Sequence, residues 1–259
     1  MYKLALLGRD IGYTRSPEVH RAIARAVDMD ERFDVFDVKY DELMGAIDML
    51  TSEYDGFFVT TPYKQTVKQF ITGERGGAIN VVRSRDRAVF DTDGIGFILA
   101  LDGSFSGWRE KVNDVLVMGA GGAAHSVAAA LVKNGKRVYV LDRTTMNAAR
   151  LASSHSGVTL YTNQPTELAV NCTSVGRNGE DILKTLCVLP EFDYAFDLVY
   201  ADGGTRFLRR AATNGAHVAD GKDMLIYQAA EGVKLITGED FDTQSVFAQV
   251  KRILEEDKQ

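Results

Sequence analysis

An apolar run that breaks into glycines, residues 114–124, constrains the fold of this chain more than any other feature. Residues 115–118 predict a buried strand, and Gly119, Gly121 and Gly122 allow a tight turn before an alanine-rich helix. The glycines let the backbone approach a pyrophosphate, while the helix N-terminus offers free N–H groups and the positive end of its dipole. A purely structural glycine turn would contain the same residues, so the elements that follow have to distinguish a dinucleotide site from such a turn.

Those elements come in the order that a Rossmann unit requires. A helix from Ala123 to about Lys133 stops at Asn134-Gly135, and a second apolar strand, residues 137–141, ends at Asp142, 23 positions after Gly119. This is near the position of the residue that reads the adenosine ribose in such a unit. We therefore expect a doubly wound parallel sheet whose dinucleotide site includes Gly119, Ala120, Gly121, Gly122, Ala123 and Asp142.

Length and composition set outer bounds on the fold and the partners. The 259 residues suit two domains, and the formal net charge of -6 argues against a nucleic-acid partner. The cysteines, Cys172 and Cys187, have no further ligand at metal-binding spacing, so no metal site is expected. The N-terminus lacks a signal-peptide pattern, and no apolar run is long enough for a bilayer. A cytoplasmic protein that acts on a small molecule is the expectation.

The first hundred residues alternate strands and helices. Strands are expected at residues 3–7, 33–38 and 54–60, with helices between them, and this spacing predicts a small, parallel-leaning α/β sheet. Ser16 precedes Pro17, which suits the first position of a helix, so Ser16 is expected to cap that helix.

Polar side chains appear where these strands end. Thr60 and Lys64 follow the third strand, at the sheet edge where ligands bind in open α/β folds. A solvated surface lysine is the alternative for Lys64. Asn80 lies inside an apolar run, where its amide must be either a structural bridge or a ligand contact. Asp93 precedes an apolar helix and has the position of an N-cap.

Taken together, these motifs resemble those of the shikimate dehydrogenase family, over nearly the whole chain from Gly8 to Gly238. The family carries two serines before a proline, a Thr-x-Pro-x-Lys motif, an asparagine in an Ala-Val-Asn-Thr run and an aspartate in an Asn-Thr-Asp-Gly run. The matching residues here are Thr14 and Ser16, Thr60 with Pro62 and Lys64, Asn80, and Asp93; residues 171–174, 197–200 and 221–228 echo later signatures.

The resemblance implies the reversible reduction of 3-dehydroshikimate to shikimate, a step in chorismate and aromatic amino acid biosynthesis. Reducing a ring ketone leaves negative charge on oxygen, so the reaction requires a positioned proton donor. The resemblance assigns this role to Lys64, oriented by Asp93. It also implies that the hydroxyls and carboxylate of the substrate are bound by Thr14, Ser16, Thr60, Asn80, Tyr200 and Gln228.

The same resemblance implies NADP as cofactor, with one departure. Arg143 and Thr144 match the family's contacts to the 2′-phosphate, and Thr173 and Gly221 match further cofactor residues. Asp142 and Asn147, however, replace the expected partners of that phosphate, and an aspartate would repel it. NAD, with quinate as well as shikimate as substrate, is the alternative. Phe58 and Arg177 also depart from the family, which expects asparagine and methionine there.

The domain organisation implied is a substrate domain at residues 1–102, completed by C-terminal helices at about 224–259, with a dinucleotide-binding domain at 103–223. The last helix is expected to pack on the N-terminal domain. A monomer or homodimer is expected. A regulatory protein that kept the fold but lost efficient chemistry is the alternative from a different functional class.

Overall fold

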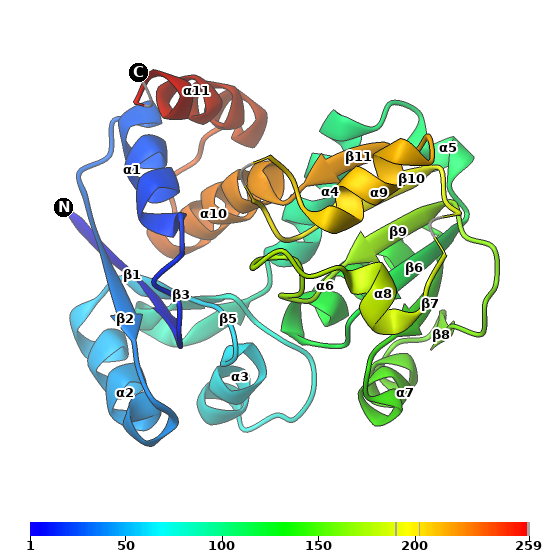
Figure 1. Cartoon of the computed structure of the whole chain (residues 1–259). Coiled ribbons are helices and arrows are strands. Elements are labelled where there is room, and N and C mark those ends of the chain that lie inside the picture. Colours follow the sequence, from blue (N-terminus) through cyan, green and yellow to red (C-terminus); the bar gives the residue numbers. More distant parts are fainter. Residues whose placement is uncertain (190, 202, 258–259) are drawn as a thin grey trace. The chain divides into compact units, whose positions relative to one another are not determined.

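In the computed structural model, which describes residues 1–189, 191–201 and 203–257, the chain divides into two units. The first comprises Met1–Gly96 and Leu225–Gln259, and the second comprises Phe97–Met224. The boundaries therefore fall inside two helices, α4 (Asp93–Ser104) and α10 (Lys222–Thr237) (Figure 1). Each unit is an α/β structure, and the expected fold class is confirmed.

The sheet of the first unit is mixed. Its order is β2-β1-β3-β4-β5, in which β2, β1 and β3 are parallel, while β4 is antiparallel to both β3 and β5. The strands are β1 (Tyr2–Gly8), β2 (Glu31–Asp37), β3 (Gly56–Val59), β4 (Val81–Arg83) and β5 (Ala88–Phe90). This confirms the parallel-leaning sheet.

The strand directions bring several chain segments to one edge of this sheet. The carboxyl ends of β1 and β3 lie side by side because the two strands are parallel. Since β4 is antiparallel to β3, its beginning lies at the same edge, where the backbone N–H of Val59 donates to the carbonyl of Asn80 at 2.8 Å. The end of β5 returns there too, since Phe90 pairs with Val81.

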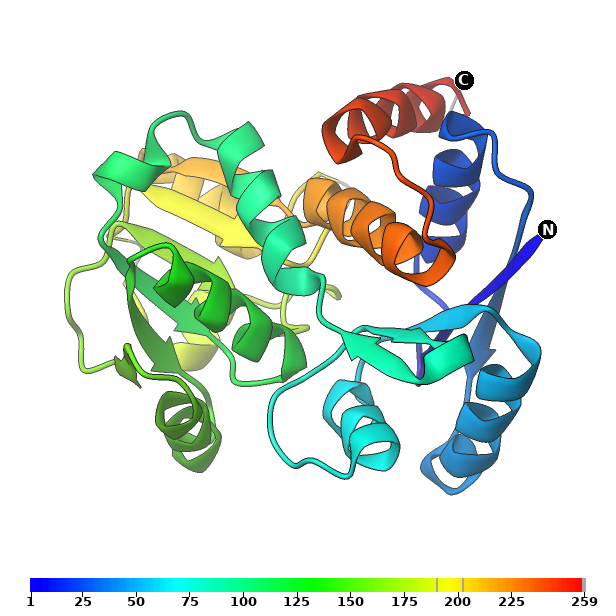
Figure 2. The ribbon, with the colours of Figure 1, turned by 180° about the vertical axis from the view of Figure 1, so that it is seen from behind.

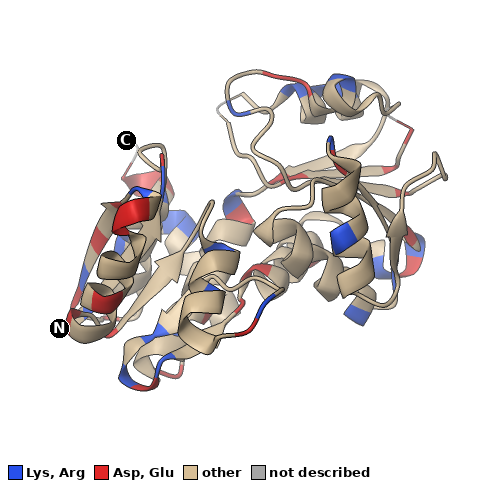
Figure 3. Ribbon diagram, turned by 90° about the horizontal axis from the view of Figure 1, so that it is seen from below, with Lys and Arg blue, Asp and Glu red and all other residues tan. Residues whose placement is uncertain are grey.

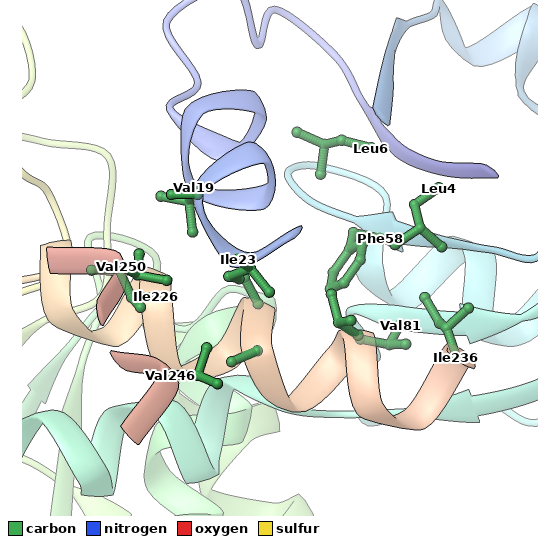
Figure 4. Packing of buried hydrophobic residues seen from close by; sticks show 14 of the residues in the cluster. Leu4, Leu6, Val19, Ile23, Phe58, Val81, Ile226, Ile236, Val246 and Val250 are labelled. Carbon is green, nitrogen blue, oxygen red and sulfur yellow. The ribbon is translucent and has the colours of Figure 1, made fainter. Parts of the chain in front are cut away.

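Helices cover both faces of this sheet. On one face, α1 (Ser16–Ala26), α10 and α11 (Thr243–Glu256) enclose a buried cluster with strand residues (Figure 4). The labelled members are Leu4, Leu6, Val19, Ile23, Phe58, Val81, Ile226, Ile236, Val246 and Val250. The last helix thus packs on α1, as expected. On the other face, α2 (Leu43–Glu53) and α3 (Lys64–Thr72) bury Leu43, Ile47, Leu50 and Val67. Short 3-10 turns, η1 (Tyr40–Glu42) and η2 (Ser84–Asp86), link these elements.

The sheet of the second unit is entirely parallel. Its order is β11-β10-β9-β6-β7-β8, so strand order reverses at β6, where a doubly wound fold binds its ligand. The strands are β6 (Asp114–Met118), β7 (Arg137–Leu141), β8 (Val158–Leu160), β9 (Leu168–Asn171), β10 (Tyr194–Asp197) and β11 (His217–Asp220).

Helices also flank both faces of this second sheet. One face packs on α8 (Ile182–Leu186) and α9 (Arg206–Thr213), which lie in front of the strands in Figure 1. The opposite face carries α6 (Gly122–Lys133) and α4, which come to the front in Figure 2. The remaining helices are α5 (Trp108–Lys111) and α7 (Thr145–Ser154).

Charged residues are interspersed along the chain. Figure 3 shows basic and acidic segments alternating on the helices and loops of both units. Among the described residues, no helix combines the length and the apolar content needed to cross a bilayer.

Candidate active site

Lys64 and Asp93 are in direct contact at the carboxyl edge of the first sheet. Lys64 is the first residue of α3 and Asp93 the first residue of α4, and the Lys64 ammonium donates to Asp93 Oδ2. Their side chains are 15 % and 6 % exposed, so the ion pair is largely shielded from water. The surface-lysine alternative is therefore wrong, and Asp93 begins its helix rather than capping it.

Asn80 joins this pair to the rest of the first unit. Its Nδ2 lies 3.1 Å from Asp93 Oδ1, 2.8 Å from Thr92 Oγ1 and 2.9 Å from Gln228 Oε1, so two N–H groups serve three acceptors. Its Oδ1 accepts from the backbone N–H of Thr92 at 2.7 Å. Asn80 is a structural bridge, and it also presents its amide beside the Lys64–Asp93 pair.

Thr92 is a member of this cluster that the sequence did not single out. It is 2 % exposed, and its hydroxyl donates to the backbone carbonyl of Gln228 at 2.9 Å. The contact ties the start of α4 to α10, although the two residues are 136 positions apart. The position of Thr92 next to Asp93 was the available sequence signal, but its hydrogen-bond partner, Gln228, could not be predicted from the sequence.

Thr14, Ser16 and Thr60 lie on the segments that follow β1 and β3. The Thr14 hydroxyl donates to Ser16 Oγ at 3.1 Å, and the backbone N–H of Ser16 lies 3.3 Å from Thr14 Oγ1. The expected cap is wrong: Ser16 is the first residue of α1, and its N-cap is Arg15, whose side chain makes no capping hydrogen bond. Thr60 is packed against Gly8, where a Cβ atom would come within 2.6 Å of Thr60 Cγ2.

Two residues that depart from the family pattern have different surroundings. Phe58 is buried in the core cluster, and its ring fills the space above Gly232, where a Cβ atom would lie 2.3 Å from Phe58 Cε1. Arg177 is exposed, on the segment after β9. Tyr200 is half-buried on the segment after β10, in the second unit.

The glycine turn of the second unit has the geometry that a pyrophosphate requires. Gly119 has φ +106°, and a Cβ atom there would lie 2.6 Å from Thr173 Cγ2, so only glycine fits without strain. Gly121 is the N-cap of α6 and has open space where its Cβ would be. Gly122 and Ala123 form the first turn of that helix, whose N–H groups remain available for an anion.

Asp142 turns back onto this glycine turn. Its Oδ2 accepts from the backbone N–H of Ala120 at 3.0 Å, and its Oδ1 accepts from the backbone N–H of Thr144 at 2.8 Å. Arg143, between Asp142 and Thr144 in the sequence, is exposed. Both carboxylate oxygens of Asp142 thus accept hydrogen bonds from backbone N–H groups, a role that the sequence did not predict for this residue.

Thr173 and Gly221 follow β9 and β11 at the same edge of the second sheet. Gly221 is pressed against Leu198, whose carbonyl oxygen would lie 2.4 Å from a Cβ atom at that position. Thr173 is held by Asn171, whose Oδ1 accepts from the Thr173 backbone N–H at 3.0 Å and from its hydroxyl at 2.7 Å. Asn171 in turn donates to Asp197, a buried carboxylate whose pKa is raised to about 7 by burial.

Two family models match this chain. The model of the shikimate dehydrogenase substrate binding domain matches residues 6–82, and the model described as shikimate / quinate 5-dehydrogenase matches residues 104–173. The first match covers the segments that carry Thr14, Lys64 and Asn80, and the second covers the glycine turn and Asp142.

Individual proteins agree with these models. The chain is 35 % identical over 252 residues to the shikimate dehydrogenase (NADP(+)) of Methanocella arvoryzae, covering 90 % of this chain and 92 % of that protein. It is 32 % identical over 248 residues to the enzyme of the same name from Thermus thermophilus, covering 92 % of this chain and 93 % of the other.

Solved structures show the same similarity. A crystal structure of shikimate 5-dehydrogenase from Thermus thermophilus, in complex with NADP(H) and shikimate, superposes with a TM-score of 0.81 at 28 % identity. The alignment covers 97 % of this chain and 99 % of that one.

Proposed function

We propose that this chain, which belongs to the shikimate dehydrogenase family, catalyses the reversible NADPH-dependent reduction of 3-dehydroshikimate to shikimate. We assign the reaction to chorismate and aromatic amino acid biosynthesis. The observation that carries the proposal is the shielded contact between Lys64 and Asp93. The proposal includes a cytoplasmic location and a monomeric or homodimeric state, both of which are expectations from the sequence.

Lys64 moves the proton in this account. As the carbonyl carbon is reduced, its oxygen gains negative charge, and the Lys64 ammonium donates a proton to it. Asp93 fixes the direction of the ammonium, because one oxygen of its carboxylate accepts from Lys64 and the other from Asn80. In the reverse direction, Lys64 removes the proton of the substrate hydroxyl. A nicotinamide dinucleotide, when bound, would supply the hydride or, in the reverse direction, accept it.

Neutral hydrogen-bonding side chains suit a small polyol acid as substrate. Each substrate hydroxyl requires a directional partner, and a site built this way rejects analogues that lack the hydroxyl. Thr14, Ser16, Thr60, Asn80 and Gln228 are the proposed contacts in the first unit, and Tyr200 is proposed from the second. The support for Asn80 and Gln228 is their direct hydrogen bond at 2.9 Å, next to Asp93.

The second unit has residues that fit a dinucleotide. The open turn at Gly121 and the free N–H groups of α6 suit the pyrophosphate, and Thr173, Gly221 and residues 119–123 would line it. Arg143 and Thr144 would bind a 2′-phosphate, since Arg143 is exposed and free to turn toward it. The relatives named for NADP(+) support NADP as the cofactor.

One observation favours a second candidate, an NAD-using quinate/shikimate dehydrogenase. Asp142 places a carboxylate beside Arg143 and Thr144, where it opposes the binding of a phosphate. Because both its oxygens accept from backbone N–H groups, the charge is held in place rather than free to turn away.

The test is the formation of reduced nicotinamide, followed by absorbance, with shikimate or quinate and NADP or NAD in all four pairings. We expect shikimate with NADP to give the highest kcat/KM. A higher value with NAD, or with quinate, selects the second candidate. If a dinucleotide binds but no pairing yields reduced cofactor, the chain is a regulatory homologue and the enzyme assignment is wrong.

A further inference from the structure

Asp197, at the end of β10, is a buried carboxylate that the proposed reaction does not use. The residue is 0 % exposed, and three donors reach it: Asn171 Nδ2 at 2.8 Å and the backbone N–H of Val199 at 3.0 Å to Oδ1, and Thr205 Oγ1 at 2.6 Å to Oδ2. No lysine or arginine of the described ranges forms an ion pair with it. Burying a carboxylate without a countercharge costs free energy, so the role of Asp197 has to be sought in the groups that it contacts.

The amide of Asn171 depends on this carboxylate for its orientation. Asn171 Nδ2 donates to Asp197 and to the carbonyl of Val175 at 2.9 Å, while its Oδ1 accepts both the N–H and the hydroxyl of Thr173. Both donor hydrogens and both acceptor sites are therefore in use. Turning the amide over would break all four hydrogen bonds, so Asp197, which can only accept when ionised, helps to fix its direction together with the carbonyl of Val175.

Thr173, the residue that Asn171 holds, lies directly against the glycine turn. Its Cγ2 occupies the space in which a Cβ atom of Gly119 would lie, at 2.6 Å, and the N–H of Cys172 donates to the carbonyl of Met118 at 2.8 Å. The chain of contacts thus runs from Asp197 through Asn171 and Thr173 to Gly119. It crosses from β10 to β9 and then to the turn after β6.

We propose that Asp197 is a positioning residue for dinucleotide binding, which holds Thr173 against Gly119 by fixing the amide of Asn171. The inference rests on the proposed function, because it takes the turn at Gly119 as the dinucleotide site. Asp197 is fully buried, and we expect it to act through Asn171.

Two substitutions separate this role from general packing. Asp197→Asn can direct its oxygen to Asn171 and Val199 and its amide N–H to the Thr205 hydroxyl, so it keeps the contact chain. Asp197→Leu has a similar volume but accepts nothing, and it leaves the N–H of Asn171 without its partner. Thr205→Val is the matched control, because it removes the contact on the far side of Asp197 and leaves Asn171 untouched.

The experiment measures the Kd for NADP by calorimetry on the full chain, without turnover, together with the Kd for shikimate and the melting temperature. We expect Asp197→Leu to weaken NADP binding about tenfold, with shikimate binding unchanged. We expect Asp197→Asn at about pH 6, where the wild-type carboxyl is largely protonated, and Thr205→Val to bind NADP as the wild type does. A folded Asp197→Leu variant with wild-type NADP affinity, or with equal losses for both ligands, overturns the inference.

A second measurement decides the matter if Asp197→Leu does not fold. Burial raises the pKa of Asp197 to about 7 although the hydrogen bonds from Thr205, Val199 and Asn171 lower it, and the charge of Asp220, at the end of β11, adds a smaller rise. The ionised carboxylate makes a charge-assisted hydrogen bond to Asn171, and the protonated form makes a weaker one. The ratio of the NADP Kd of Asp197→Asn to that of the wild type should therefore rise from about pH 6 to about pH 8, a range chosen around that pKa.

Titration of NADP itself cancels in this ratio, so a ratio that stays constant with pH overturns the inference. Failure of the proposed function looks different, since the wild type would then yield no reduced cofactor in any pairing or would bind neither NADP nor NAD.

Discussion

The carboxylate of Asp142 accepts a hydrogen bond from the backbone N–H of Ala120, across 3.0 Å, and so ties the end of β7 to the glycine turn. A second bond, from the N–H of Thr144 at 2.8 Å, fixes the other oxygen. The charge of Asp142 therefore lies at a fixed place beside Arg143, which is the residue proposed to bind a 2′-phosphate.

Replacing this aspartate with asparagine should shift the cofactor preference. In Asp142→Asn the repulsion of a phosphate is removed, and one of the two backbone hydrogen bonds can persist. We expect the ratio of kcat/KM for NADP to that for NAD to rise about tenfold, which corresponds to about 1.4 kcal/mol. The measurement is the initial rate with each dinucleotide at fixed shikimate.

Arg143→Ala provides the opposing control for the cofactor preference. It should lower kcat/KM for NADP and leave the value for NAD within about twofold, because NAD lacks the phosphate. An unchanged ratio in both variants would mean that neither side chain faces the 2′ position of the ribose.

Asn80 should contribute to both catalysis and stability. Asn80→Ala removes a donor to Asp93 and leaves the N–H of Thr92 without its acceptor. We expect kcat/KM for shikimate to fall about 100-fold and the free energy of unfolding to drop by about 1–3 kcal/mol. Gln69→Ala, at an exposed position of α3, is the control and should change neither. Wild-type kinetics in Asn80→Ala would remove this amide from the site.

Local patterns predicted the parts of the fold whose cause is local. Residues 114–142 contain their own strand, turn, helix and strand, and the structure has these elements in that order. The helix at Pro17 was also predicted, but the expected cap by Ser16 was wrong because the hydroxyl of Ser16 accepts from Thr14 instead. A choice between two partners of similar strength cannot be made from one segment alone.

Hydrogen bonds between residues far apart in the chain could not be predicted from the sequence. The hydrogen bond from Asn171 to Asp197 joins residues 26 positions apart, and that from Thr92 to Gln228 joins residues 136 apart. The first depends on which strands are neighbours, and the second depends on how α10 packs beside the end of β5. The family resemblance supplied Lys64 and Asp93 as a pair, and their contact in the structure agrees with that expectation, but it gave no role to Thr92 or Asp197.

A buried pair between α1 and β2 makes a prediction about stability. His20 Nδ1 lies 3.3 Å from Glu31 Oε1, their side chains are 1 % and 2 % exposed, and the His20 ring is stacked 3.9 Å from that of Phe33. Neither Glu31 oxygen has a hydrogen-bond partner among the described residues. We expect His20→Leu to cost about 3 kcal/mol in urea unfolding, because it leaves Glu31 buried and unpaired.

The double variant His20→Leu with Glu31→Met should recover most of that loss, since no charge remains to be buried. Arg25, on the same helix as His20, forms an exposed ion pair with Asp257. As a control, Arg25→Ala breaks that pair and should lower the free energy of unfolding by less than about 1 kcal/mol. A double variant as unstable as His20→Leu would contradict this explanation.

The pair formed by His125 and His155 makes a prediction about pH. Their ring nitrogens, Nδ1 and Nε2, lie 3.2 Å apart, and burial followed by the proximity of His155 lowers the pKa of His125. The unfolded chain therefore takes up a proton before the folded chain does, and the pair's contribution to stability is lost as the pH falls below about 6.5. We expect His125→Gln to flatten this part of the dependence.

The measurement for this pair is the free energy of unfolding of wild type and His125→Gln between about pH 5 and pH 7.5, a window set by the ordinary pKa of histidine. The difference between the two proteins removes the contributions of other groups, including Asp197. If that difference is constant over the window, His125 does not titrate differently in the folded and unfolded states.

The central claim is that Lys64 transfers the proton in shikimate oxidation, and the most direct test compares kcat and KM for Lys64→Ala with those of the wild type. Lys68→Ala, one helical turn further along α3, is the control. We expect kcat for Lys64→Ala to fall by about 10²- to 10⁴-fold with little change in KM, and Lys68→Ala to match the wild type. A Lys64→Ala variant that reduces NADP with shikimate at the wild-type rate would contradict the account.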